Sequence, residues 1–468
     1  MSVSERRKGM SGKEAVAPLY QRLPRGPHQL GPKAVAHHQR IRMHGAMVEA
    51  VASSGYGGTS VKQVIALAGV SRRAFYEQFA NKEECFLATF DLLAARGFAR
   101  INQAYRAAEG GLEDRLRAAF AACAQEIAAN PKGAVLAIVE AQTAGTAGQL
   151  RLRRATATFE RMLSDSFARS PGAIPLPIPV IRGIVGGLHE AASTRLREQQ
   201  DGDVPVLTEE MLEWTLLFQA KATERMAGHL ARRVPAMVQG APSDGHGPAG
   251  ARTGGGDVHE RLLQSVLRLA VVDDYQELTA PQIAEEARVP IEDFFELFPG
   301  RDECYLAAFD ELSDELLLLV ADPALVSSEW PAAVRRTIGR LMRHLAKHPL
   351  YAHTIAAEAF AAGPETVDRN LELAHSIATL LTEGAPDATQ SELAVEAAAG
   401  AIWHTVRCQV TSGQIHLLPA LSDYVSYVVL APLIGADAAA EVVTEDVEPV
   451  SNHPARPDAS MDEALGAT

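Results

Sequence analysis

The sequence predicts an all-α protein made of two tandem lobes of similar fold. Apolar residues recur at i, i+3 and i+4 from His37 to about Arg233, and again from Val258 to about Gly435. No strand-like alternation lasts more than a few residues in either stretch. The chain also repeats itself, because a shift of 219 residues aligns 60–91 with 279–310 without a gap, and twelve of these 32 pairs are identical. At least these segments are therefore a tandem duplication.

Composition allows large cores, and the charge is divided unevenly between the two copies. The 468 residues are 47% hydrophobic and 22% charged, which excludes general disorder. The net charge of −14 argues at first against a nucleic-acid partner. However, residues 1–85 hold thirteen Lys and Arg against six Asp and Glu, a balance of +7. Residues 257–304 hold four against twelve, a balance of −8. Only the first copy therefore has the positive charge that favours binding to a nucleic acid.

The repeats and composition changes divide the chain into seven segments. We expect a flexible basic arm over residues 1–36, which contain four prolines. This arm could bind DNA, or it could be an ordinary disordered tail. A DNA-binding domain (37–82), a helical regulatory domain (83–234) and a Gly/Pro-rich linker (235–256) follow. The second lobe repeats this plan with an acidic domain (257–302) and a helical domain (303–436), before a disordered acidic tail (437–468).

The first repeat has the pattern of a helix-turn-helix. One helix is expected from Gln39 to Ser54, and Gly residues follow it. Ser60 can cap a second helix, Val61 to Ala68. Gly69 suits a left-handed turn, and Ser71 can cap a third helix, Arg72 to Phe79.

The third helix shows basic and phenolic groups beside its buried anchors. Phe75 and Phe79 are one turn apart and would point inward, which leaves Arg72, Arg73 and Tyr76 off that anchor. Arg can form paired hydrogen bonds with guanine in the major groove, whereas the Tyr76 hydroxyl, Ser60 and Lys82 can reach phosphates. The pattern therefore predicts a recognition helix for double-stranded DNA.

These residues resemble the TetR family of transcriptional regulators. The resemblance lies in Thr59-Ser60-Val61, Ile65-Ala66, Ala68-Gly69-Val70-Ser71, Phe75-Tyr76, Phe79 and Lys82-Glu83, at the family's spacing. It implies in each lobe a three-helix domain, a connecting helix and a larger helical domain that binds a ligand and dimerises. It also implies a ligand-responsive repressor that binds a DNA operator and an unknown small-molecule effector. The DNA-binding residues predicted on this basis are Thr59, Ser60, Ser71, Arg72, Arg73, Ala74, Tyr76 and Lys82, of which Arg72, Arg73 and Ala74 would face bases.

The second copy keeps the anchors of this motif but not its charge. Phe294 and Phe298 repeat the two buried aromatic positions. Glu292 and Asp293 stand where the first copy has Arg73 and Ala74, so phosphates would be repelled. We therefore expect a degenerate helix-turn-helix that retains the fold without binding DNA.

The helical domains offer small residues at which two helices can approach closely. Gly186 and Gly187 lie in a helix expected at Gly183 to Leu196, and Gly400 lies in its counterpart in the second lobe. By the resemblance, the two lobes would form a four-helix bundle within one chain, an intrachain pseudo-dimer with a homodimer as an alternative. The second apolar helix of each lobe, around Leu212 to Phe218 and Leu421 to Leu433, would complete it. Plain core packing is the competing interpretation.

Enzyme motifs are missing from the sequence. There is no P-loop, Rossmann fingerprint, GxSxG or HExxH pattern, so we expect no enzyme, cofactor or metal site. The four cysteines, Cys85, Cys123, Cys304 and Cys408, are too scattered for a disulfide framework, which fits a reduced cytoplasmic location. No signal peptide or membrane span is expected, since the longest apolar stretch is short and contains Pro432. An all-α protein that binds a ligand or partner but not DNA is the alternative function.

Overall fold

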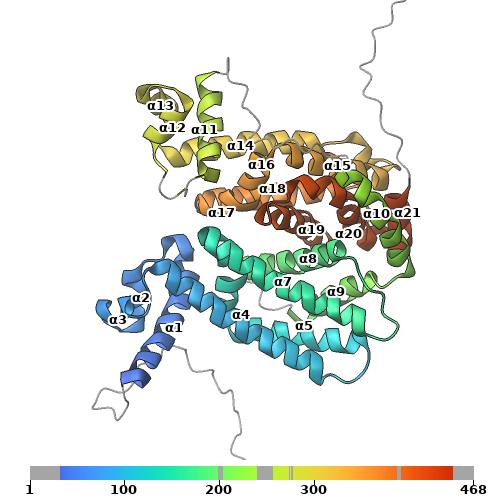
Figure 1. Cartoon of the computed structure of the whole chain (residues 1–468), viewed down its shortest axis with the longest axis horizontal. Coiled ribbons are helices and arrows are strands. Elements are labelled where there is room, and N and C mark those ends of the chain that lie inside the picture. Colours follow the sequence, from blue (N-terminus) through green and yellow to red (C-terminus); the bar gives the residue numbers. More distant parts are fainter. Residues whose placement is uncertain are drawn as a thin grey trace, which may run out of the picture.

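The computed structural model describes residues 32–198, 204–239, 257–272, 275, 278–386 and 392–445. Within these ranges the protein is helical and has no strand, which confirms the all-α prediction. Most helices of the first half of the sequence gather in one lobe, and those of the second half gather in another (Figure 1). At one end, each lobe projects a small three-helix domain, which we call the first head and the second head.

The first head consists of α1 (Pro32–Gly58), α2 (Val61–Ala68) and α3 (Arg72–Tyr76), and α4 (Lys82–Ala107) leads from it into the body of the lobe. Met43, Met47, Phe75, Phe79 and Phe86 form its core, each almost fully buried. This core continues into the body through Leu136 and Leu152, so the first head is packed firmly on its lobe.

The body of the first lobe packs its helices around α4. Its elements are α5 (Leu112–Ala129), α6 (Pro131–Ala134), η1 (Val135–Val139), η2 (Glu140–Thr143), α7 (Gly145–Arg169), α8 (Ile178–Arg197), α9 (Val204–Leu217) and α10 (Lys221–Gln239). The π-helical turn η1 lies between α6 and the 3₁₀ turn η2, and η1 contacts α1, α4 and α8. The head and the regulatory body therefore meet at an irregular stretch of helix.

The second lobe repeats the plan. Its head contains α11 (Val258–Val272), α12 (Ala280–Ala287) and α13 (Ile291–Leu297), followed by α14 (Arg301–Val320). Its body contains η4 (Pro323–Val326), α15 (Trp330–Lys347), α16 (Pro349–His353), η5 (Thr354–Glu358), α17 (Ala359–Ala361), α18 (Pro364–Thr382), α19 (Glu392–Thr411), η7 (Ile415–Leu417), α20 (Leu418–Ile434) and α21 (Ala436–Thr444).

Individual contacts also recur between the lobes. Asp91 of α4 pairs with Arg151 of α7 at 2.9 Å, and Asp310 of α14 pairs with Arg369 of α18 at 3.0 Å. The buried thiols Cys85 and Cys304 occupy equivalent places, and burial raises the pKa of each to about 12. These thiols are therefore protonated core groups at neutral pH.

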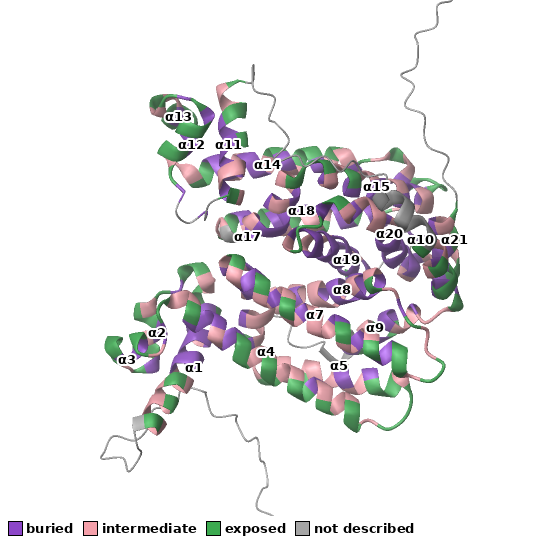
Figure 2. Cartoon of the chain, viewed as in Figure 1, coloured by how far each residue is buried: buried purple, intermediate pink, exposed green. Residues whose placement is uncertain are grey.

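The bodies of the two lobes meet along α8 and α19, which lie side by side and are largely buried (Figure 2). A methyl group added at Gly186 or at Gly400 would overlap the carbonyl oxygen of the other glycine. The expected close approach of helices at these residues is thus present within one chain. A single apolar core extends through both bodies, with Phe218 of the first lobe 5.9 Å from the ring of Tyr427 in the second.

The helix pairing around this core differs from the sequence prediction in one respect. α9 packs mainly on α5, inside its own lobe, whereas α10 packs against α21 across the interface. α20 packs mainly on α15 but also contacts α8 and α10 of the first lobe. The interlobe bundle is therefore formed by α8, α10, α19, α20 and α21.

Three predicted boundaries are wrong by several residues. α1 begins at Pro32, inside the expected arm, because proline is tolerated in the first turn of a helix. α10 runs to Gln239 and so enters the expected linker, and α21 occupies the start of the expected tail, where Ala439 and Val443 are buried. The rest of the arm (1–31), of the linker (240–256) and of the tail (446–468) lies outside the described residues.

One stretch, Ile415–Ile434, is long and apolar enough to cross a membrane by length and composition alone. It comprises η7 and α20, and 56% of the most apolar window is buried in the protein. Its neighbours are α8, α15, α19 and α21. Such packing is that of a core helix.

Candidate nucleic-acid interface and an internal cavity

The turn between α2 and α3 is formed by local hydrogen bonds that the sequence predicts. Ser60 precedes α2 and accepts a bond from the Gln63 N–H at 3.3 Å, while Gln63 accepts one from the Ser60 N–H at 2.7 Å. Gly69 ends α2 with φ 59°, in the left-handed region. Ser71 then caps α3 by accepting from the Ala74 N–H at 3.1 Å. These caps orient the short α3 relative to α2.

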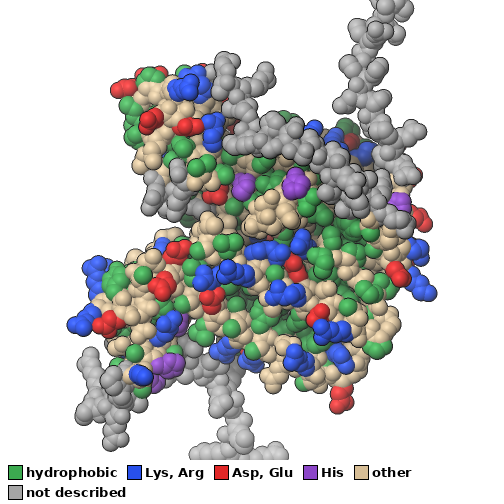
Figure 3. All heavy atoms as spheres, viewed as in Figure 1, with side chains coloured by type: hydrophobic (Ala, Val, Ile, Leu, Met, Phe, Trp, Pro, Cys, Tyr) green, Lys and Arg blue, Asp and Glu red, His purple; other side chains and the backbone are tan. Residues whose placement is uncertain are grey.

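Three predicted DNA-facing residues lie on one exposed surface of α3. Arg73 is 89% exposed and its Nε donates to Glu77 at 2.8 Å. The Arg72 guanidinium lies 5.6 Å from the centre of the Tyr76 ring, which is itself 46% exposed. We call Arg72, Arg73 and Tyr76 the α3 face. It projects from the end of the first head, where basic side chains gather (Figure 3).

Two other predicted residues are buried and cannot belong to this face. Ala74 is only 8% exposed, because it lies on the side of α3 that packs against the head. Thr59 is 3% exposed, and its hydroxyl donates to the Gly55 carbonyl at 2.7 Å, where the α1 backbone breaks. The prediction that these two side chains contact DNA is therefore wrong, and Thr59 instead closes the turn between α1 and α2.

Lys82 is half-buried and tied to the end of α1. Its Nζ donates to the Tyr56 carbonyl at 3.0 Å and lies 4.2 Å from the centre of the Tyr56 ring. Burial lowers the pKa of its ammonium group. In the second head, Arg301 makes the same pair of contacts with Tyr275, at 2.9 Å to the carbonyl and 4.6 Å to the ring. The second head keeps this pair of contacts although it lacks the basic face, so Lys82 has a structural role that is separate from its predicted phosphate contact.

The second head carries an acidic and apolar surface in place of the α3 face. Glu292 and Glu296 are exposed on α13, and Phe295, which is 55% exposed, stands where the first head has Tyr76. The Gly of the turn is replaced by Arg288, which keeps the left-handed conformation with φ 55°. The acidic helix-turn-helix geometry predicted for this segment is thus present.

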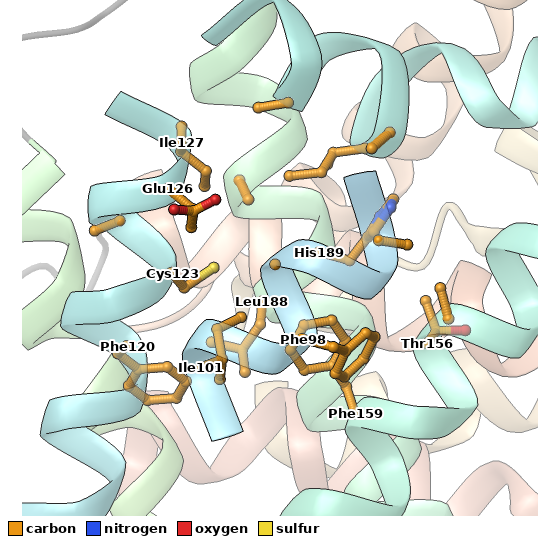
Figure 4. A pocket seen from close by; sticks show the side chains of 18 of the residues that line it. Phe98, Ile101, Phe120, Cys123, Glu126, Ile127, Thr156, Phe159, Leu188 and His189 are labelled. Carbon is orange, nitrogen blue, oxygen red and sulfur yellow. The ribbon is translucent and has the colours of Figure 1, made fainter. Parts of the chain in front are cut away.

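A cavity of about 310 Å³ lies inside the first lobe, a feature that sequence reasoning did not locate. It is lined mainly by α4, α5, α7 and α8, and most of its lining is apolar (Figure 4). The rings of Phe98 and Phe159 are tilted against each other on one side, with their centres 4.2 Å apart, and Phe120 and Ile101 lie across from them. Phe120, Phe159 and Met162 line it, whereas Phe167 and Trp330 belong to the apolar core.

Among the described residues that line the cavity, His189 has a polar atom without a hydrogen-bond partner. His189 of α8 hydrogen-bonds the Ile138 backbone through one ring nitrogen, while its buried Nε2 has no hydrogen-bond partner. Burial, together with the nearby Arg407, lowers the pKa of His189 to about 3. The ring is therefore neutral at physiological pH, and Nε2 is free to accept a hydrogen bond.

The fold of the first head and its exposed basic helix define a helix-turn-helix DNA-binding protein. Residues 46–89 match the model of the family described as bacterial regulatory proteins, tetR family. This segment is therefore a DNA-binding domain of the kind found in that family, as the sequence resemblance predicted.

Two solved structures are similar to part of the chain. One is the fatty acid degradation regulator FadR from Bacillus halodurans, with 20% identity and a TM-score of 0.36, covering 40% of this chain and 97% of that one. The other is the transcriptional regulator FadR from Bacillus subtilis in complex with stearoyl-CoA, with 18% identity and a TM-score of 0.35, covering 38% and 97%. No curated protein matches the chain.

Proposed function

We propose that this protein is a cytoplasmic, ligand-responsive repressor that binds a DNA operator through the first head alone. The observation that carries the proposal is the α3 face, an exposed basic helix surface set by two capped helices. Arg72 and Arg73 would contact base edges, and Tyr76, Ser60, Ser71 and Lys82 would contact or orient toward phosphates. Exposed Lys62 on α2 adds a further cation beside this face.

The interlobe bundle would replace the dimer interface of the family, so that one chain forms an intrachain pseudo-dimer with one DNA-binding head. The second head would take the place of the second reading head, but its acidic surface would be repelled by phosphates. A palindromic operator would then require two chains, whereas one chain would cover one half-site.

The cavity would hold the small-molecule effector. Its phenylalanines favour an apolar ligand, and the free Nε2 of His189 favours one that carries a hydroxyl or amide donor. Because Phe90, Phe98 and Ile101 of α4 line the cavity and α4 leads directly into the first head, a ligand that shifts α4 would also reorient α3.

Substitution of the α3 face tests the DNA-binding part of the proposal. We expect Arg72→Ala to weaken specific binding by about 1–3 kcal/mol, and Tyr76→Phe to weaken it less, because an Arg–guanine pair is lost in the first case and a phosphate contact in the second. Fluorescence anisotropy with DNA from upstream of the gene measures both. Arg161→Ala, on exposed α7 outside the head, is the matched control and should bind normally. Unchanged affinity in a folded Arg72→Ala variant would reject the assignment.

A further inference from the structure

A buried cluster of three potential metal ligands joins the two lobes, and its residues belong neither to the α3 face nor to the lining of the cavity. Glu160 comes from α7 of the first lobe, and His404 and Cys408 lie one turn apart on α19 of the second. Their side chains are buried, and one ligand atom from each lies within 4.8 Å of the other two.

The distances in this cluster fit a tetrahedral zinc site. His404 Nε2 is 3.2 Å from Glu160 Oε1 and 3.5 Å from Cys408 Sγ. Zinc bonds of ordinary length at tetrahedral angles separate N from O by about 3.3 Å and N from S by about 3.6 Å. Both measured edges therefore correspond to ligands around a common centre.

The surroundings of Glu160 can hold it in a ligating position. Arg153 donates to Glu160 Oε1 at 2.9 Å, and Arg182 lies 3.6 Å from the other carboxylate oxygen. Each carboxylate oxygen has a second lone pair, so the guanidinium groups can keep their contacts while a metal ion binds. Without a metal ion, the same contacts correspond to an ion pair between Glu160 and His404, with Cys408 Sγ in hydrogen-bond contact with His404 Nε2.

The cluster occurs on only one side of the pseudo-symmetric bundle. When Arg151 is matched with Arg369 and Gly186 with Gly400, the equivalents of Glu160, His404 and Cys408 are Ala378, Glu190 and Thr194. That set has one carboxylate and neither imidazole nor thiol. The ligand set is therefore not imposed by packing in this fold.

We propose that Glu160, His404 and Cys408 bind a divalent transition-metal ion of the zinc type, with a fourth position left for water or another ligand. Thiolate and imidazole ligands favour Zn²⁺ over Mg²⁺ or Ca²⁺, which prefer oxygen. The bound ion would fasten α7 to α19. It would also bear on the cavity, because Phe159 and Met162, neighbours of Glu160 on α7, line that space.

The test is metal binding by the full-length protein, with no dependence on DNA or effector. The chain is stripped with chelator, incubated with Zn²⁺, dialysed and analysed for metal by mass spectrometry. We expect one zinc per chain, and an affinity at least about 100-fold lower in Cys408→Ser and His404→Gln. Cys304→Ala removes a buried cysteine of the second head and should keep full zinc content.

Cobalt substitution covers the case in which the variants fail to fold. Co²⁺ bound by the unmodified protein should give a thiolate-to-cobalt charge-transfer band and the strong visible absorption of a four-coordinate site. Zinc should also raise the melting temperature of the unmodified protein. Absence of zinc from the unmodified chain, equal zinc in folded Cys408→Ser, or a cobalt spectrum without a thiolate band would each overturn the proposal and leave an ordinary ion pair.

Discussion

At the scale of single residues, the first head contains a buried histidine that must stay neutral. The Nδ1–H of His44 donates to the Thr89 hydroxyl at 2.8 Å, and that hydroxyl donates in turn to the Cys85 carbonyl. The ring also packs edge-on against Phe79. Burial, and then the nearby Arg40, lower the pKa of His44 to about 4. The folded head therefore resists protonation of a ring that accepts a proton readily when unfolded.

This shift predicts acid sensitivity of the first head. Because the pKa is lower in the folded state, the contribution of His44 to stability is present above the unfolded value of about 6.5 and is lost as the pH falls toward 4. Between pH 7 and pH 5 the loss should be about 2 kcal/mol. Hydrogen exchange of peptides from α1 and α4 measures it.

The second lobe supplies the matched variant for this experiment. Leu263 stands at the repeat position of His44 and is buried. His44→Leu should therefore be accommodated, and the pH dependence of the head should shrink by about the same 2 kcal/mol. If the opening free energy of the variant falls as steeply with pH as that of the unmodified protein, His44 is not the group that titrates.

At the scale of elements, the turn before α13 has the same backbone conformation as the turn in the first head. It has an arginine, however, where the first head has the glycine that suits this conformation. Arg288 adopts φ 55° and ψ 48°, close to the φ 59° and ψ 42° of Gly69 in the first head. A side chain in this left-handed region costs about 1–2 kcal/mol, because its Cβ crowds the following carbonyl. The second head therefore stores strain that the first head avoids.

Arg288→Gly should stabilise the second head by about 1 kcal/mol. The gain is the relieved strain, less the greater chain entropy of glycine in the unfolded state. Gly69→Ala makes the reverse change in the first head and should destabilise it by a similar amount. Hydrogen exchange of α12 and α13 in one variant, and of α2 and α3 in the other, reads both effects. A loss of protection in Arg288→Gly would show that the arginine side chain contributes more than its strain costs.

The helices and turns of the first head could be predicted from local sequence patterns. Which of its side chains are exposed could be determined only from the tertiary structure. Ser60, Gly69 and Ser71 act through hydrogen bonds or backbone angles within a few residues, so the sequence identifies them. Ala74 and Thr59 were misassigned because burial depends on how α3 and the end of α1 pack. The end of α3 at Tyr76, rather than Phe79, likewise reflects the inward turn of Phe79 onto the core.

Sites assembled from distant helices were the hardest to predict. The cavity combines side chains from residues 90 to 211, and no local pattern marks which aromatic residues face an open space. Glu160 meets His404 only because α7 and α19 belong to lobes that pack together. The four-residue spacing of His404 and Cys408 was the one signal in the sequence, since it places both on the same side of a helix.

At the scale of the whole molecule, the two lobes depend on a backbone contact that tolerates no side chain. The Gly186 carbonyl faces the place where Gly400 would carry a Cβ, and the reverse also holds. Around this point, α8 and α19 bury almost all of their facing residues. Separation of the helices by one methyl group would disturb packing over the whole length of the interface.

Gly186→Ala should consequently destabilise the protein as a whole by about 1–3 kcal/mol, since an overpacked contact has to be relieved by backbone movement. Gly97→Ala is a suitable control: Gly97 also lies inside a long helix, but an added methyl group there has no atom within 4 Å. That change should leave stability equal or raise it by about 0.5–1 kcal/mol through helix propensity. Calorimetric melting of both variants compares them. If the Gly186→Ala variant has the same melting temperature as the unmodified protein, the two lobes have room for a methyl group between them. The intrachain pseudo-dimer then lacks the close contact on which we base it.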